Sequence, residues 1–359
     1  MIVQNKIRET FSIQLIDWYH KNKRDLPWRK TTDPYKIWVS EVMLQQTQVD
    51  FVLSYYARFV TLFPTIGHLA EAPLDSVLKA WEGLGYYARA RNLHRAAKQI
   101  VDTNRSCLPE HYAELLNIRG IGPYTAAAVA SIAFGETYAV VDGNVVRVLS
   151  RLFKIADVPA KYGKAKFVHL SGQLLPQDCP GDFNQAMMEL GALLCTPAAP
   201  NCSDCPVNEL CEAHRTMPDP SVLPVKMARK KIPHVDVVVG IVWKDGKVFV
   251  KRRPPHGLLG GLWEFPGGKV ANGISKTICL QQKLEQKFNL KIKESEPFMS
   301  VKHAYSHFKM TLHAYRCEVS DGPVKAQGIE WKWLSPEELR DYPFPKANKK
   351  VLDSFLDTL

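Results

Sequence analysis

The 359-residue sequence lacks an apolar run long enough to cross a membrane. A membrane-spanning helix needs about 20 consecutive apolar residues, and no stretch approaches that length. The N-terminal stretch MIVQNKIRETFSIQL is amphipathic and mixed in charge, so it lacks the apolar core of a signal peptide. We therefore expect neither a membrane segment nor secretion.

Acidic side chains are in short supply relative to basic ones. There are 36 Asp and Glu against 47 Lys and Arg, which gives a net charge of +11. This balance fits a polyanionic partner such as nucleic acid, although many basic proteins bind none. The length predicts more than one domain and permits a sizeable core.

Cysteines are few outside one short segment. Of the eight, four form the pattern C-x6-C-x2-C-x5-C, at Cys195, Cys202, Cys205 and Cys211. In a cytosolic chain such a cluster indicates a metal site in preference to disulfides. Four thiolates in one loop suit either tetrahedral zinc or a [4Fe–4S] cluster, and spacing alone does not separate the two.

The stretch from Leu115 to Arg151 is the most informative part of the sequence. It predicts a helix end, a tight turn with Gly120 and Gly122, and a second helix that begins at Pro123. The backbone N–H groups at that helix start would form an anion site. An ordinary pair of antiparallel helices explains the same glycines, and these residues alone favour it.

Asp142 follows the apolar run 138–141 and precedes a predicted helix at 145–149. Capping of that helix is the more common role for an aspartate in this position. The same position suits a carboxylate that must stay ionised, because the helix dipole stabilises negative charge.

Glu41 lies on the otherwise apolar face of another predicted helix. We predict Asp33 as its N-cap and Pro34 as its first residue. The i+4 and i+3 spacings then place Glu41 on one face with Ile37 and Leu44. A glutamate at the edge of that face, reaching solvent, is the simpler interpretation. An inward-pointing Glu41 would have its pKa raised by desolvation, which makes a usable acid at neutral pH.

Together, Glu41 and Asp142 would supply the two groups that cleavage of an N-glycosidic bond needs. A protonated acid protonates the leaving base, and an ionised carboxylate stabilises an oxocarbenium-like sugar. The two residues lie far apart in the sequence, so only the fold can bring them together.

Two segments resemble a known enzyme family. The stretch 115–151 resembles the helix-hairpin-helix and Gly/Pro-Asp signature of the DNA glycosylase superfamily that includes endonuclease III. The segment WVSEVMLQQTQV, with LPWR upstream, is similar to the MutY family of adenine DNA glycosylases. That resemblance implies that Glu41 protonates adenine and that further side chains surround the flipped base. These are Trp28, Arg29, Leu44, Gln46, Thr47, Gln185 and Glu189. The last two fit a solvent-facing helix position equally well.

The segment LGYYARARNL also matches this family, and it implies that Tyr86 wedges into the duplex beside 8-oxoguanine. A packed aromatic pair of Tyr86 and Tyr87 is a serious alternative. The residues expected to meet DNA in the helical part are Gln48, Leu84, Tyr86, Gly120 and Gly122.

Tyr124 occupies the position where bifunctional members of the superfamily have a lysine that attacks the sugar. Tyrosine cannot form a Schiff base, so efficient strand cleavage is not expected. The resemblance implies instead that Tyr124 supports the active site and that Asn144 positions Asp142 or the sugar. It also favours a [4Fe–4S] cluster over zinc at the four cysteines.

The sequence changes character after residue 216. Residues 217–234 contain several prolines and basic residues and predict an extended linker. A hairpin with a KDGK turn, a glycine-rich segment, a helix near 274–289 and further strands follow. This half of the chain resembles the Nudix fold.

The catalytic Nudix box is not preserved. Aligned from Gly268, its metal-binding and catalytic positions contain no acid. They are Ile274, Gln282, Lys283, Gln286 and Lys287. A magnesium site needs several carboxylates, so we expect a reader domain and not a diphosphatase. The resemblance to the MutY family implies that Tyr305, Ser306 and His307 recognise 8-oxoguanine, with tyrosine in place of the family's phenylalanine.

We therefore predict a multidomain protein. An all-α helix-hairpin-helix glycosylase domain spans 1–216 with an iron–sulfur loop at 195–211, a linker spans 217–234, and an α+β Nudix-like domain spans 235–359. The predicted activity is that of a monofunctional adenine DNA glycosylase, a hydrolase of base excision repair. Its expected partner is double-stranded DNA with A:8-oxoguanine or A:G mispairs, and we expect a monomer in the bacterial cytoplasm at the nucleoid.

Three alternatives stay open. An endonuclease III-like pyrimidine glycosylase with lyase activity is disfavoured by Tyr124 and by the second domain. A non-catalytic DNA-lesion binder would share the basic surface but would not need both Glu41 and Asp142. A Nudix hydrolase is disfavoured by the lost acidic box.

Overall fold

The computed structural model describes residues 5–103, 106–157, 165–225, 232–271, 273–305, 307–320 and 322–359. The chain divides into two compact units. The first comprises Met1–Glu71 and Asn92–Arg229, and the second comprises Ala72–Arg91 and Lys230–Leu359.

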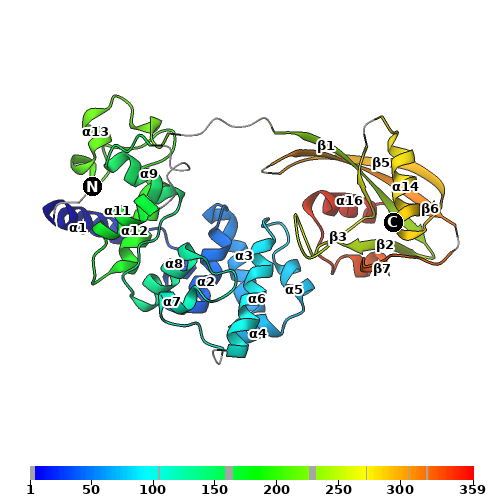
Figure 1. Ribbon diagram of the computed structural model, residues 1–359, viewed down its shortest axis with the longest axis horizontal. Helices are drawn as coiled ribbons and strands as arrows, with labels where there is room; N and C mark the ends of the chain where they lie inside the picture. Colours follow the sequence, from blue (N-terminus) through cyan, green and yellow to red (C-terminus); the bar gives the residue numbers. More distant parts are fainter. Residues whose placement is uncertain are drawn as a thin grey trace. The chain divides into compact units, whose positions relative to one another are not determined.

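The first unit is helical (Figure 1). Its described α-helices are α1 (Asn5–Asn22), α2 (Pro34–Leu44), α3 (Val49–Leu62), α4 (Ile66–Glu71), most of α6 (Ala88–Thr103), α7 (Tyr112–Leu115), α8 (Pro123–Phe134), α9 (Gly143–Leu152), α11 (Ala165–Leu174), α12 (Pro180–Leu193) and α13 (Glu212–Thr216).

The helix starts that matter for function are fixed by local sequence. The Asp33 carboxylate accepts hydrogen bonds from the backbone N–H groups of Tyr35 and Lys36, and Pro34 opens α2. The Asp142 carboxylate accepts from Val145 N and caps α9. Both predicted caps are therefore confirmed, as expected where a side-chain oxygen satisfies an otherwise unpaired helical N–H group.

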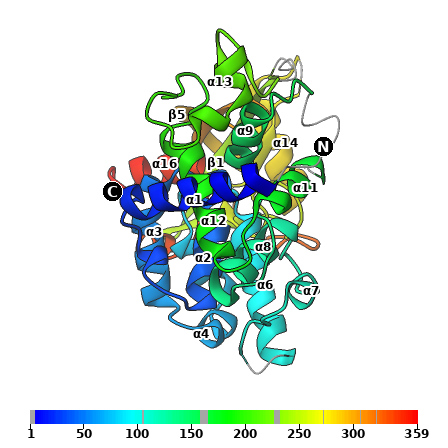
Figure 2. The same ribbon diagram turned by 90° about the vertical axis from the view of Figure 1, so that its left-hand side faces the viewer.

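Helix α12 holds this unit together. It contacts α1 and α9 on one side and α8 on another, and Figure 2 shows α1 lying across it. Buried Phe11, Leu149 and Phe183 belong to the core between α1, α9 and α12. Because α8 and α9 both pack on α12, their N-terminal ends are held in a fixed relation.

The second unit is built on a seven-stranded mixed sheet with the order β3-β2-β1-β6-β5, in which β4 also pairs with β1 and β7 with β2. Strand β1 runs parallel to β6 and antiparallel to β2 and β4. The strands are β1 (His234–Lys244), β2 (Lys247–Arg252), β3 (Trp263–Glu264), β4 (Gly267–Lys269), β5 (Ile292–Ala304), β6 (Lys309–Val319) and β7 (Trp331–Leu334).

Helices cover both faces of this sheet. Helix α14 (Lys276–Phe288) packs over Val238, Val242 and Phe249, whereas α16 (Lys346–Leu356) packs over the opposite face, as Figure 1 shows. Short α15 (Pro336–Leu339) follows β7. The predicted β1–β2 hairpin is confirmed. Its turn residues Asp245 and Gly246 have φ values of 49° and 71°, as a two-residue type I′ turn requires.

The segment Ala72–Arg91, with α5 (Leu74–Ala80), belongs to this second unit by its contacts. Arg252 Nη2 lies 2.7 Å from Asp75 Oδ1, and the Phe344 backbone N–H donates to Glu82 Oε1 at 2.8 Å. The segment lies within the predicted helical range 1–216, yet these bonds group it with the sheet.

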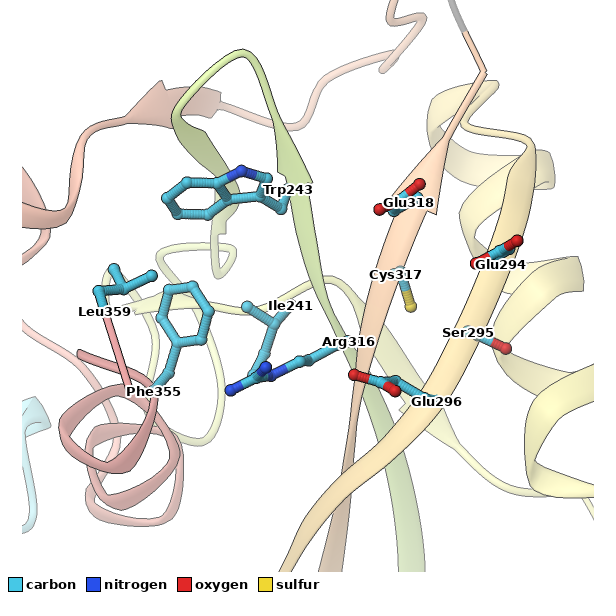
Figure 3. A pocket seen from close by; sticks show the side chains of 10 residues that line it. All are labelled: Ile241, Trp243, Glu294, Ser295, Glu296, Arg316, Cys317, Glu318, Phe355 and Leu359. Carbon is cyan, nitrogen blue, oxygen red and sulfur yellow. The ribbon is translucent and has the colours of Figure 1, made fainter. Parts of the chain in front are cut away.

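A cavity of about 640 Å³ opens where the end of α16 meets β1, β5 and β6 (Figure 3). Trp243 and Phe355 form an aromatic wall, while Glu294 and Glu318 stand opposite. None of the site residues predicted from the sequence lines this cavity. Among the described residues, no helix is both long and apolar enough to cross a membrane.

Candidate active site

Glu41 points into the first unit. It is 5% exposed on α2, and Tyr124 Oη from α8 donates to its Oε2 at 2.8 Å. Burial raises the pKa of Glu41 to about 7, against the lowering effect of the Tyr124 hydrogen bond. The alternative of a solvent-reaching glutamate is therefore excluded, and Glu41 is an acid poised near neutral pH.

Asp142 stands at the N-terminus of α9. Its Oδ1 accepts from Val145 N and its Oδ2 from Asn144 Nδ2, both at 2.8 Å. Burial raises the pKa of Asp142, while these hydrogen bonds and the charge of Arg147 oppose the shift. Asp142 accepts hydrogen bonds on both of its oxygens, whereas Glu41 accepts from Tyr124 on one, so the anion of Asp142 is the better stabilised of the two.

The fold brings these two carboxyl groups into one site. The negative charge of Asp142 contributes to the raised pKa of Glu41, an effect that requires the groups to be close. Tyr124 lies between α2 and α12, since its hydroxyl also lies 3.4 Å from Met188 Sδ. Such a pair, one proton donor and one anion, is suited to acid-assisted cleavage of a glycosidic bond.

Asn144 links Asp142 to a deeper network. Its Oδ1 accepts from Arg147 Nη2 at 2.7 Å, and Arg147 also donates to the backbone oxygens of Cys195 and Gly191. Gly191 has no room for a side chain, because a Cβ there would lie 2.6 Å from Asn144 Cβ. Asn144 is therefore held on both sides, which fixes the Asp142 carboxylate.

Glu189 is 1% exposed and paired with two arginines. It accepts hydrogen bonds from both the side chain and backbone of Arg24 and from both terminal nitrogens of Arg29, at 2.6–2.9 Å. Burial alone would raise the pKa of Glu189, but these bonds outweigh it and lower the value to about 2. The alternative of a solvent-facing Glu189 is excluded, while Gln185 is partly exposed.

The other residues predicted to surround the base lie just before α2 and at its C-terminal end. Trp28 is buried edge-on against Tyr56, with ring centroids 5.2 Å apart. Leu44 and Thr47 are half-buried, and Gln46 is exposed with a φ of 59°. This left-handed residue turns the chain sharply before α3, where Gln48 is the exposed N-cap.

Sequence reasoning missed Arg24 and Gln45. Gln45 Nε2 donates to Thr125 Oγ1 at 3.1 Å and so ties the end of α2 to α8. The one available signal for Arg24 was its position in the sequence, four residues before Trp28. No sequence pattern, however, indicates a bond to a glutamate 165 positions away.

The turn before α8 has the predicted glycine geometry. Gly120 has a φ of 93°, and a Cβ there would lie 2.8 Å from Asn92 Cβ. Gly122 is the N-cap and supplies no side-chain cap, so the first N–H groups of α8 are left for another acceptor. In the 72–91 segment, Leu84 is buried, whereas Tyr86 is 45% exposed with a φ of 48°.

Known proteins match both halves of this chain. Residues 39–173 match a model described as HhH-GPD superfamily base excision DNA repair protein, and residues 237–354 match a NUDIX domain model. The adenine DNA glycosylase of Rattus norvegicus is 36% identical over 95% of this chain and 77% of its own length. The adenine DNA glycosylase of Buchnera aphidicola subsp. Schizaphis graminum is 31% identical over 96% of this chain and 98% of its own length. The chain belongs to the adenine DNA glycosylase family.

A solved structure of a thermostable thymine-DNA glycosylase shares the fold of the helical part. It aligns with a TM-score of 0.54 at 30% identity, over 59% of this chain and 98% of its own. The two domain matches confirm the predicted fold class, a helix-hairpin-helix domain followed by a Nudix-like domain.

The four clustered cysteines and Arg151 line one small cavity. Arg151 Nη1 donates to Cys195 Sγ at 3.3 Å, and its guanidinium also bonds the backbone oxygens of Thr196, Pro197 and Leu223. Over the described ranges, no three His, Cys, Asp or Glu side chains form a group that would hold a metal ion. The four cysteines thus share one cavity.

The loop expected to recognise 8-oxoguanine joins β5 and β6. Tyr305 stacks on Phe308 at 4.8 Å and packs edge-on against His303 at 4.6 Å, and its backbone N–H donates to Phe308 O. His307 is exposed. Ser306 lies outside the described residues.

Proposed function

We propose that this chain hydrolyses the N-glycosidic bond of adenine mispaired with 8-oxoguanine or guanine. The single observation that supports this most is the buried Glu41, whose pKa is raised to about 7, beside the hydrogen-bonded anion of Asp142. A non-catalytic DNA binder has no need for such a pair, because an unneeded buried carboxyl group costs stability.

In the proposed reaction, adenine is flipped out of the duplex into the first unit. Tyr124 donates a hydrogen bond to Oε2 of Glu41. The Oε1 atom is therefore left to carry the proton and donate it to the base. The bond between the sugar C1′ and the base nitrogen breaks, and its electron pair leaves with the protonated adenine. Asp142 stabilises the cationic sugar until water adds at C1′ and releases a proton.

The product is an abasic site in an intact strand. Tyr124 is buried, and its pKa is raised well above the usual tyrosine value by burial and by the carboxylates of Glu41 and Asp142. It is therefore a hydrogen-bond donor to Glu41 and not a nucleophile, and it has no amine with which to form a Schiff base.

We assign the surroundings of the flipped base to the residues near the end of α2 and to Gln185. Trp28, Leu44, Gln46 and Thr47 would form its walls. Arg29 and Glu189 would act as one unit, since Glu189 fixes the guanidinium through two bonds. An ionised Glu189 so fully bonded would support the base pocket through Arg29.

The DNA contacts proposed for the helical elements are Gln48, Tyr86, Gly120 and Gly122. Leu84, the other residue expected to meet DNA, is buried in this structure. The uncapped N-terminus of α8 suits a phosphate, and the exposed Tyr86 suits insertion between bases. We assign discrimination of 8-oxoguanine to the loop with Tyr305, Ser306 and His307. A serine there can both donate to and accept from the lesion.

We propose that Cys195, Cys202, Cys205 and Cys211 hold a [4Fe–4S] cluster. Four cysteines that line one cavity can supply the four thiolates of such a cluster. The cluster would order this loop, and Arg147 and Arg151 connect the loop to α9. We also expect a monomer in the bacterial cytoplasm, at the nucleoid.

The proposed function is tested with duplexes that contain A:8-oxoguanine, A:G, A:T or thymine glycol, scored for alkali-labile sites. Alkali-labile sites at adenine in the first two duplexes are expected, with the faster reaction on A:8-oxoguanine. Cleavage of the thymine glycol duplex without adenine release would favour the pyrimidine glycosylase alternative.

A further inference from the structure

The second unit has a group of charged side chains at the site where the Nudix box has lost its acids. Four cations, Lys251, Arg253, Lys283 and Lys287, surround the one carboxylate of Glu264; we call this group the basic cluster. We propose that the basic cluster binds a phosphate group, and that this is a backbone phosphate of the DNA strand near the 305–307 loop. The choice of DNA rests on the proposed function.

Strand pairing places two of these side chains side by side. Side chains alternate along a strand, so Lys251 of β2 shares the α14 face with Phe249, which packs beneath that helix. Arg253 directly follows the last residue of β2. Lys251 is paired in register with Glu264 of β3. Both Lys251 and Arg253 form ion pairs with Glu264, whose side chain is only 13% exposed.

Helix α14 supplies the other two cations. Lys283 and Lys287 are one turn apart and therefore neighbours on the helix surface. The stem of Lys283 lies on the backbone of Gly268, where an added Cβ would be 3.1 Å from Lys283 Cδ. Burial lowers the pKa of Lys287, and the nearby charges of Lys251 and Lys283 lower it further. The α14 lysines thus face the strand cations.

The charges in this cluster do not balance. Glu264 is already shared by Lys251 and Arg253, and neither Lys283 nor Lys287 forms an ion pair with any described residue. Like charges at i and i+4 destabilise a helix, and the folded chain tolerates them here next to two further cations. An anion would relieve this repulsion, and phosphate accepts hydrogen bonds from several lysines at once.

The position of the cluster favours DNA as the source of that phosphate. The charges of Arg253 and Glu264 both act on the Tyr305 hydroxyl, so the basic cluster adjoins the loop expected to read the lesion. A loop that contacts a base lies within reach of the phosphates that flank it. A free phosphate ester has the same chemistry and is the second possible source.

The test compares the double variant Lys283→Gln/Lys287→Gln with Lys291→Gln/Lys293→Gln, which removes the same charge at exposed positions of the same unit. Duplex affinity is measured from 50 to 200 mM salt. Each lost phosphate contact lowers the slope of log K against log salt by about 0.9, or about 3.5-fold in affinity over this range. The first variant should lose up to two such contacts and the control none, with unchanged melting temperatures for both.

Two further measurements complete the test. The variant Lys283→Arg/Lys287→Arg keeps both positive charges and should therefore keep the wild-type slope, which separates an effect of charge from an effect on folding. Calorimetry with pyrophosphate in EDTA tests the free ligand: binding lost in the glutamine variant, with the DNA slope unchanged, would keep the phosphate site but reject DNA as its ligand. Equal slopes for all proteins and no pyrophosphate binding would overturn the proposal. Adenine release by the wild type is scored separately, so failure of the proposed function is recognised independently.

Discussion

The pH dependence of base release tests the proposed acid. With a pKa of about 7, Glu41 would be about nine-tenths protonated at pH 6 and about one-tenth at pH 8. Since only the protonated form of Glu41 donates, the single-turnover rate on an A:8-oxoguanine duplex should fall about tenfold per pH unit above pH 8 and level off near pH 6. A second decline is expected only in acid strong enough to protonate Asp142, whose anion the reaction also needs.

Replacing Tyr124 by phenylalanine tests the physical cause of that value. The Tyr124 hydrogen bond lowers the pKa of Glu41, so its loss should raise the pKa and move the falling limb of the profile to higher pH. The readout is the position of the limb, which does not depend on any loss in absolute rate. Tyr138→Phe, a change at an exposed tyrosine stacked on Tyr112, should leave the limb in place. A flat profile, or a Tyr124→Phe limb at lower pH, would refute the reasoning.

Three further outcomes are expected. Gly120→Ala should destabilise the protein by about 1–3 kcal/mol, because the added Cβ clashes with Asn92 and the residue has a positive φ. Gly122→Ala, where the added Cβ meets open space, should leave stability unchanged. Equal melting temperatures for the two variants would contradict this expectation. Elemental analysis of anaerobically purified protein should find iron with sulfide, lost in Cys202→Ser, and a single zinc would exclude the cluster. Borohydride should not trap a covalent complex with the substrate strand, and efficient trapping that depends on Asp142 would show lyase chemistry.

Local sequence was sufficient for the helix caps and the hairpin. Asp33 and Asp142 each bond to backbone groups within three residues, and the Asp245–Gly246 turn depends on backbone angles that few residues adopt. Such features are decided by neighbours in sequence, so their prediction needs no knowledge of the tertiary fold.

Tertiary packing decided what the sequence left open. The i+3 and i+4 pattern placed Glu41 on the apolar face, but its burial depends on Tyr124, 83 positions away. Glu189 was equally compatible with solvent until the fold brought Arg24 and Arg29 against it. The basic cluster likewise depends on strand register and on the placement of α14, which no local pattern specifies.

The central claim is that Glu41 and Asp142 act as proton donor and stabilising anion. It is tested most directly by single-turnover adenine release from an A:8-oxoguanine duplex by Glu41→Gln and Asp142→Asn, with duplex affinity measured on the same proteins. Each substitution should slow release by roughly 100- to 10,000-fold while binding stays near the wild-type level. Near-normal release by either variant would contradict the account.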